Sequence, residues 1–586
     1  MKLRYIQPGI ASLSYIMARR LAFADKTHYL EILERPDSPD VPVFLRPRRF
    51  GKTLFTDILF NYYDKSKAPD FENNFKGTWI YSHPTEYKNS YYCVRLDFSS
   101  VTSKVSGIAG GLISELCGAF KDFSDRYPDR GLPASFFEKD PGDDPAKVIT
   151  RFIANFRSHS KSGEWLYFII DEYDHFINEV LSKDREAFRD LTSTEEGHSG
   201  LVKSFYTCLK RYKGPEKDKP IAKIFMTGVS AISLDSVTSG FNIETGISAD
   251  AEFNAMAGFT RDELSQIIDE TVDFSALGGI TKDQVMEALK QRCGGYRFSE
   301  QTEEEIFCPG ACLEFLGDLL SDGEIPKALK DLNSDIKTRK LRDILGLTDP
   351  AAAEEICDAI FRRKRIASGQ LASFGIDMRG DETFDRTQAL SQLVYRGYLT
   401  REPERPDRNC EFVWCRAPNE ACYQTFVEYE AERVGFSRAR GLDLSEVSER
   451  GDLTPLLNEV SARIARLNPS AQSAFNERSL QTVCFYTAMD GNDNALQPEL
   501  QCDTGDGEHA DLFIRNRTEG GRQYLLALKY LSDAKGNDQA VAAKLEEAKA
   551  QLERYRKAPN FKDVKNLDCW TIVFVNAEPK AVEKLA

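Results

Sequence analysis

The amino-acid sequence predicts an α/β protein with a largely parallel sheet, a helical middle region and a smaller C-terminal α/β unit. From about residue 40 to 235, short apolar runs alternate with helical stretches, which is the pattern of buried parallel strands that helices connect. From about residue 255 helical patterns dominate, and beyond about 450 strands and helices mix again. A chain of 586 residues is also too long for one hydrophobic core, so roughly three or four domains are expected.

The composition limits the classes of function. Hydrophobic residues make up 41% and charged residues 29% of the chain, as in globular proteins. The formal net charge of −15 repels nucleic acid, so binding DNA or RNA would require a local basic patch or a metal site. The 13 cysteines form neither a disulfide framework nor a zinc-ligand pattern, which indicates a reducing, cytoplasmic location. No run approaches about 18 apolar residues, so no membrane span is expected.

The elements of the first region follow one another in regular order. Each expected strand is short and apolar, as strands buried on both faces are. The expected strands are Val43–Leu45, Tyr92–Phe98, Leu166–Ile170 and Lys223–Met226. The expected helices are Leu54–Tyr62, Gly107–Phe120, Pro145–Phe156 and Asp184–Leu191.

The loop between the first strand and the first helix carries a phosphate-binding motif, Arg46-Pro47-Arg48-Arg49-Phe50-Gly51-Lys52-Thr53. A strand–loop–helix junction presents unpaired N–H groups and a positive helix end to phosphate. Gly51 permits close backbone approach, Lys52 can reach the β- and γ-phosphates, and Thr53 can ligate Mg²⁺. Arg46 replaces the usual first glycine, and a basic surface loop that caps a helix is the alternative interpretation. The expected nucleotide-binding residues are Arg46, Arg49, Phe50, Gly51, Lys52, Thr53 and Leu54.

A second motif is the apolar run Trp165–Ile170, which ends in Asp171 and Glu172. In P-loop ATPases a strand of this kind lies beside the phosphate loop, and its acid holds Mg²⁺. We therefore expect Asp171 to bind Mg²⁺ together with Thr53, and Glu172 to act as general base toward the attacking water. Solvated charges at a strand end are the alternative.

Three further residues are candidates for sensing the γ-phosphate. Thr227 and Ser230 follow the strand Lys223–Met226, although turn chemistry explains them as well. Arg297 follows Gly294 and Gly295 in the helical region, and it either contacts the γ-phosphate from a lid or pairs with a surface acid.

The remaining elements are expected in the following order. Thr260–Ile268 reads as a capped helix, since Glu263 stands at capping-box spacing from Thr260. Helices then continue from Lys282–Arg292 to about residue 365. The β-like segments Tyr395–Leu399 and Glu411–Trp414 follow, with an exposed turn at Arg401–Arg408 between them. In the C-terminal unit, helices are expected at Ser473–Thr487 and Ala540–Arg556, and strands at Ala510–Ile514, Tyr524–Leu528 and Trp570–Val575.

Several runs together resemble the AAA-ATPase-like family of bacteria and some eukaryotes, whose members are usually fused to a C-terminal PD-(D/E)XK nuclease-like domain. These runs are Phe23–Thr27, Arg46–Thr53, Leu96–Ser99, Ile170–Asp174, Thr227–Ser230 and Gly295–Phe298. The resemblance makes Arg46 an expected feature of the loop. It implies a P-loop ATPase parallel sheet at 1–255, a helical lid at 256–335, a helical or winged-helix-like linker at 336–445 and a PD-(D/E)XK-like α/β domain at 446–586.

The nuclease motif of that family requires an Asp on one strand, then an acid and a lysine two residues apart on the next. Alternate residues of a strand face the same side, so the acid and the lysine would point together at a phosphodiester. Asp511 and Lys529 match, but Ala527 replaces the second acid and cannot bind Mg²⁺. Gln551 and Tyr555 resemble the helix motif of a RecB-like subset. Migrated carboxylates that would restore the site are sought at Glu508, Asp533 and Glu547.

These expectations combine into an ATPase that binds ATP and Mg²⁺ and regulates or drives a nuclease-like module without activity. Two alternatives stay open. In one, nucleotide only locks the fold of an effector that binds nucleic acid or a protein partner. In the other, a migrated carboxylate makes the nuclease active. Oligomerisation is compatible with all three.

Overall fold

The computed structural model describes residues 4–101, 105–137, 144–183, 200–214, 216, 218–230, 243–326, 334–371, 383–402, 412–433, 435–436, 442–490, 496–516, 520–532 and 537–585. Two compact units make up the chain. The first contains Met1–Leu332, Asp343–Ala352 and Ala367–Cys422, and the second contains Asn333–Arg342, Ala353–Ile366 and Tyr423–Ala586. Residues of the proposed linker 336–445 therefore fall in both units. No helix in the described ranges has the length and apolar character needed to cross a membrane.

The first unit contains a five-stranded parallel sheet, as the sequence predicts. Its strand order is β2-β3-β4-β1-β5, and every neighbouring pair is parallel. The bounds are β1 Pro42–Leu45, β2 Tyr92–Asp97, β3 Leu166–Asp171, β4 Ile221–Gly228 and β5 Thr245–Gly246. The four strands expected from apolar runs all form, whereas the short and exposed β5 lacks such a run.

The order of these strands places one strand between β1 and β3. The acid-ended strand β3 does not pair with the phosphate-loop strand β1, because β4 lies between them. Val43, Phe44 and Leu45 of β1 pair with Met226, Thr227 and Gly228 of β4. The polar end of β4 is therefore inserted between the phosphate loop and the acid-ended strand.

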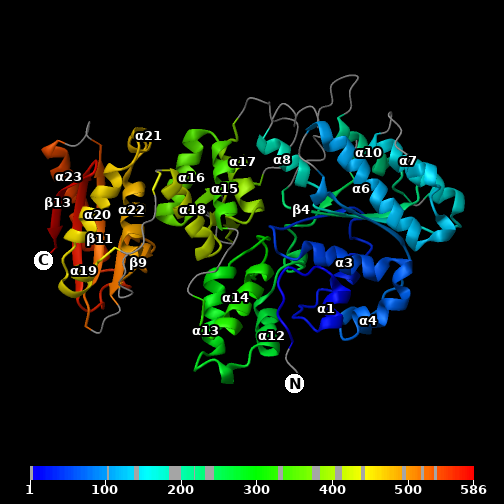
Figure 1. Ribbon diagram of the computed structural model, residues 1–586, viewed down its shortest axis with the longest axis horizontal. Helices are drawn as coiled ribbons and strands as arrows, with labels where there is room; N and C mark the ends of the chain where they lie inside the picture. The colour runs from blue at the N-terminus through cyan, green and yellow to red at the C-terminus, as the bar shows by residue number, and fades with distance from the viewer. Residues whose placement is uncertain are drawn as a thin grey trace. The chain divides into compact units, whose positions relative to one another are not determined.

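Helices cover both faces of this sheet. Figure 1 shows α6, α7 and α10 on one side, and α1, α3 and α4 on the other. Their bounds are α1 Leu13–Arg19, α3 Lys52–Tyr63, α4 Phe71–Phe75, α6 Val105–Arg126, α7 Pro145–His159 and α10 Leu201–Arg211. Three further helices of this part of the chain are α2 Tyr29–Ile32, α5 Trp79–Ser82 and α8 His175–Lys183. The predicted helix Asp184–Leu191 lies outside the described residues.

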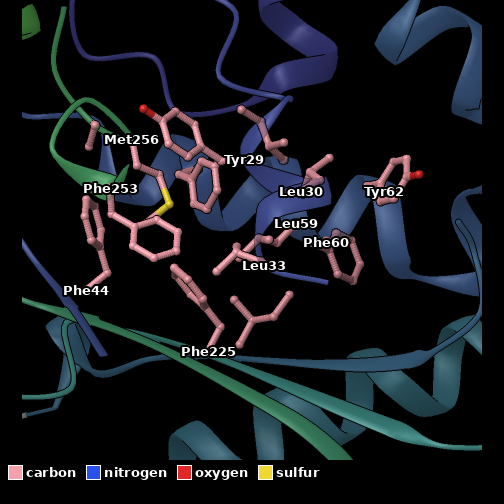
Figure 2. Packing of buried hydrophobic residues seen from close by; sticks show 14 of the residues in the cluster. Tyr29, Leu30, Leu33, Phe44, Leu59, Phe60, Tyr62, Phe225, Phe253 and Met256 are labelled. Carbon is pink, nitrogen blue, oxygen red and sulfur yellow. The ribbon is translucent and has the colours of Figure 1, made fainter. Parts of the chain in front are cut away.

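The core beneath α3 explains why this helix forms where it does. Phe55, Ile58, Leu59 and Tyr62 are buried at helical spacing and pack into one apolar cluster. Phe44 of β1 and Phe225 of β4 belong to the same cluster (Figure 2). The cluster thereby fixes the first turn of α3, and with it Lys52 and Thr53, against the sheet.

Helices and short strands make up the chain from α12 to α18. Capping boxes at Thr260 and Thr281 start α12 and α13, which confirms the predicted helix starts. The segment predicted as β-like at Tyr395–Leu399 is instead the end of a helix and a turn. The bounds are α12 Arg261–Thr271, α13 Lys282–Cys293, α14 Pro309–Asp322, α15 Ser334–Gly346, α16 Pro350–Arg363, β6 Arg365–Ser368, α17 Arg386–Tyr395, β7 Thr400–Arg401, β8 Val413–Arg416 and α18 Glu420–Arg433.

The second unit contains a mixed five-stranded sheet of order β13-β12-β11-β10-β9. β11 and β12 are parallel and the other pairs are antiparallel. The bounds are α19 Ser445–Arg450, α20 Thr454–Ala465, α21 Pro469–Ser473, α22 Glu477–Met489, β9 Leu496–Asp503, β10 His509–Asn516, β11 Gln523–Leu531, α23 Asp538–Tyr555, β12 Leu567–Val575 and β13 Glu578–Lys584. The one helix expected at Ser473–Thr487 is thus two, α21 and α22.

Candidate nucleotide site

The phosphate loop runs from the end of β1 to the start of α3. Gly51 is the N-cap of α3 and has φ +97°, a left-handed conformation that glycine adopts without steric cost. Arg49 is also left-handed, with φ +72°. These two residues turn the chain so that α3 begins at Lys52, and its first N–H groups and positive end face the loop.

Lys52 is buried at the centre of this loop, with 4% of its surface exposed. Its ammonium donates to the carbonyl oxygens of Arg46 at 3.0 Å and Pro47 at 3.3 Å. The Glu172 carboxylate lies 3.5 Å from the same nitrogen. A buried ammonium held between loop carbonyls and one carboxylate fits a site where phosphate oxygens replace the carboxylate.

Asp171 ends β3 next to this loop. The Thr227 hydroxyl of β4 donates to Oδ1 of Asp171, and Thr53 lines the same cavity as this carboxylate. Burial raises the pKa of Asp171, although the bonds from Thr227 and Thr53 and the charge of Lys52 act against that rise. Hydroxyl and carboxylate oxygens, brought together at a helix N-terminus, are the ligands that Mg²⁺ takes in such sites.

Glu172 has an unusual backbone conformation. Its φ is +51°, in the left-handed region that costs a non-glycine residue about 1 kcal/mol or more. Its N–H donates to Oδ1 of Asp171 at 3.0 Å, and its carboxylate faces Lys52. The turn therefore sends Asp171 and Glu172 toward the same loop instead of to opposite faces of a strand.

Thr227 and Ser230 are positioned differently from the sensor role expected for them. Both are buried, and the Thr227 hydroxyl is committed to Asp171. The Ser230 hydroxyl bonds to Asp174 at 3.0 Å and to Asn178 at 2.8 Å. Asp174 also accepts the N–H groups of Val229 and Ser230. The motif Thr227–Ser230 thus locks the end of β4 to the acid-ended strand, and Ser230 presents no hydroxyl to a phosphate.

Arg46 points away from the loop into the protein, with 1% of its surface exposed. Its guanidinium donates to the carbonyl oxygens of Leu45, Ser248, Phe253 and Asn254. The rings of Phe44 and Phe298 lie 4.3 and 4.0 Å from its central carbon, on cation–π geometry. The prediction that the Arg46 side chain binds nucleotide is therefore not supported, because carbonyls and aromatic rings surround its charge.

The other loop side chains also contact protein. Phe50 packs edge-on against Tyr296 and Phe298, with ring centroids 4.9 and 5.3 Å apart. Arg49 pairs with Glu314 of α14, and Leu54 packs against the core under α3. Of the seven nucleotide-binding residues expected, the structure thus brings Gly51, Lys52 and Thr53 to the site and assigns the side chains of Arg46, Arg49, Phe50 and Leu54 to packing.

Arg297 does not reach the loop. Its guanidinium donates to the Glu303 carbonyl at 3.1 Å and lies 3.4 Å from the Glu305 carboxylate. Its backbone N–H and C=O both bond to the Thr400 hydroxyl. The structure therefore agrees with the second interpretation of Arg297, an ion pair with an acid, because the Glu305 carboxylate balances its charge.

A half-open cavity of about 360 Å³ begins at Thr53 and Asp171. It lies between α3 and α6, and its other polar lining includes Arg95, Asp97, Glu115 and Arg126. Arg95 pairs with Asp57, and Glu115 accepts the N–H of Asp97. The cavity gives solvent access to the two expected Mg²⁺ ligands.

The second unit brings the predicted nuclease-like residues onto one face of its sheet. Phe513 pairs with Leu525 in the antiparallel register of β10 and β11, which places Asp511 opposite Ala527. Asp511 accepts the N–H of Leu528 at 2.8 Å, and the Gln551 amide of α23 lies 3.4 Å from its other oxygen. Gln551 also bonds to Tyr555. Burial raises the pKa of Asp511 to about 6.

The Lys529 side chain forms ion pairs with two acids. Its ammonium lies 3.3 Å from Glu477 and 3.4 Å from Glu547. Glu477, the first residue of α22, also pairs with Arg362 at 3.1 Å. Sequence reasoning missed Glu477, since an acid at a helix N-terminus carries no signal of its contacts across the fold.

Of the carboxylates sought as migrated ligands, Glu547 lies beside Lys529 of the nuclease-like site, whereas Glu508 pairs with a different cation. Glu547 binds Lys529 and Lys544, and Glu508 binds Arg554. Asp533 lies outside the described residues. Within the described ranges, no group of three or more acidic, histidine or cysteine side chains is arranged to hold a metal ion.

Comparison with known proteins bears on the first unit. A curated relative, an uncharacterized protein in the vnfD 5' region of Azotobacter chroococcum mcd 1, is 24% identical over 247 residues. The match covers 42% of this chain and 41% of the relative's length. The Walker-type ATPase of Pyrococcus abyssi, a solved structure, aligns over 68% of this chain and 94% of its own, with 13% identity and a TM-score of 0.38. Residues 7–238 match the family described as predicted AAA-ATPase, which confirms the resemblance for that region as an AAA-ATPase-like domain.

Proposed function

We propose that this chain is a Mg²⁺-dependent ATPase whose hydrolytic residue is Glu172. The observation that supports the proposal is the convergence of Lys52, Thr53, Asp171 and Glu172 on one loop within the matched domain. Solvated charges at a strand end, the alternative for the two acids, do not fit a buried Asp171 that the Thr227 hydroxyl orients.

Each residue has a distinct part in this reaction. The Lys52 ammonium binds the β- and γ-phosphate oxygens in the position that Glu172 now fills. Thr53 and Asp171 would hold Mg²⁺, which would neutralise charge on the transferred phosphoryl group. Glu172, released from Lys52, accepts the proton of the attacking water. Thr227 holds Asp171 in one orientation throughout.

The direct test is nucleotide binding by the Lys52→Ala protein. Calorimetry with ADP and Mg²⁺ should show micromolar-range binding by the wild type and at least a tenfold loss in the variant, since charge-assisted bonds to phosphate disappear. Lys76→Ala, which removes an exposed lysine paired with Glu72, is the matched control and should bind normally. Equal affinity of Lys52→Ala and wild type would contradict the site.

The second unit is proposed to be a PD-(D/E)XK-like module without nuclease activity, which the ATPase regulates or drives. Ala527 stands where the fold needs an acid, and it is fully buried beside Ala548, Leu552 and Tyr555. Lys529 is neutralised by Glu477 and Glu547. With catalysis absent, recognition of nucleic acid or a protein partner is the role left for this unit.

A further inference from the structure

Two arginines near the phosphate loop form no ion pair with a described acid. Arg48, within the loop, is exposed and contacts the His175 ring nitrogen at 3.3 Å. Arg396, at the C-terminal cap of α17, donates to the side-chain oxygen of Gln392 at 2.9 Å. Neither forms an ion pair with a carboxylate anywhere in the described part of the chain.

The turn that follows α17 brings Arg396 to the loop. Gly397 has φ +79°, and a Cβ atom on it would lie 2.8 Å from Cγ of Pro47. The chain at Gly397 is therefore packed directly on the phosphate loop, one residue from Arg396. Arg396 and the loop both belong to the first compact unit.

Electrostatics agrees with this proximity. Burial lowers the pKa of the Arg396 guanidinium, and the charges of Asp174 and Arg48 act on it in opposite directions. Asp174 does not serve as its counter-ion, because the carboxylate is bound by Val229, Ser230 and Asn178. Gln392, which holds Arg396, is itself buried and its side-chain nitrogen has no hydrogen-bond partner. Two arginines that act on one another without an ion-paired carboxylate favour the approach of an anion.

We propose that Arg396, together with Arg48, binds the terminal phosphate of the nucleoside triphosphate held by Lys52. Arg48 contacts His175, four residues beyond Asp171, so the pair lies on the side where the acid-ended strand meets the loop. That side is where the γ-phosphate and its Mg²⁺ belong. The inference rests on the proposed ATPase function. It adds Arg396, at the end of α17, to the nucleotide site, so that this residue distinguishes ATP from ADP.

The experiment compares a non-hydrolysable ATP analogue with ADP, both with Mg²⁺, by calorimetry on the full chain. Arg396→Ala should lower the affinity for the ATP analogue by about tenfold or more and change the affinity for ADP by less than about threefold. Arg401→Ala is the matched control, because this nearby arginine pairs with Glu300 and its removal should leave the affinity ratio unchanged. Arg48→Ala, at an exposed position, should shift the ratio in the same direction.

The outcomes separate the two proposals. An unchanged affinity ratio in a folded Arg396→Ala protein overturns the inference and leaves the ATPase proposal intact. If Arg396→Ala does not fold, Arg396→Gln keeps the side-chain length without the charge, and the same criterion applies to it and to Arg48→Ala. A wild-type protein that binds neither ligand would instead overturn the ATPase proposal.

Discussion

At the scale of single residues, Glu172 lies beside both Lys52 and Asp171. In the structure its carboxylate lies 3.5 Å from the Lys52 ammonium, while its left-handed backbone keeps it beside Asp171. Phosphate oxygens compete for the same ammonium. In the proposed ATPase, nucleotide entry would therefore release the Glu172 carboxylate from Lys52 beside the loop.

Replacing Glu172 by Gln removes the base and keeps the shape of the side chain. ATP turnover, measured by phosphate release, should fall by about 10²-fold or more, and ADP affinity should stay the same or increase because a competitor for Lys52 is lost. Glu179→Gln, an acid on α8 that pairs with His175, is the control and should hydrolyse ATP normally. Undiminished turnover in Glu172→Gln would leave this residue with a structural role only.

At the scale of elements, Phe298 connects the segment after α13 to the phosphate loop. Its ring lies against the Arg46 guanidinium and edge-on to Phe50. Phe298→Leu should lower the free energy of unfolding by about 1–2 kcal/mol and weaken ADP binding, since the loop loses both ring contacts. Urea unfolding and calorimetry check this. Phe274→Leu, at another partly buried position near α12 and α13, is the control, and equal behaviour of the two variants would rule out a special role for Phe298.

The elements also show what the sequence could predict and what it could not. Apolar runs predicted β1, β2, β3 and β4, because strands buried on both faces need continuous apolar residues. The segment Tyr395–Leu399 looks like a strand by composition, but the left-handed Gly397 turns it. The Gly51-Lys52-Thr53 motif could be found by pattern, whereas Arg297 and Arg396 could not be told apart, because their roles depend on which acids the fold brings beside them.

At the scale of the whole molecule, the question is whether the second unit cuts nucleic acid. Wild-type protein should leave plasmid and RNA intact with Mg²⁺ or Mn²⁺, with or without ATP, since Asp511 alone provides too few ligands for the metal. Asp511→Ala and Glu477→Gln are the companion variants. Cleavage by the wild type that Asp511→Ala abolishes would show an active nuclease. Loss of that cleavage in Glu477→Gln would then assign the missing acid to α22.

The buried Arg46 has a consequence for how the loop tolerates change. Arg46→Gly would bring the loop closer to the general phosphate-binding consensus, and consensus substitutions often stabilise proteins. Here the same change would empty a space the size of an arginine side chain between Phe44 and Phe298 and leave four carbonyl oxygens without their donor. Arg46→Gly should therefore destabilise this protein. The first residue of the loop is anchored in the protein interior.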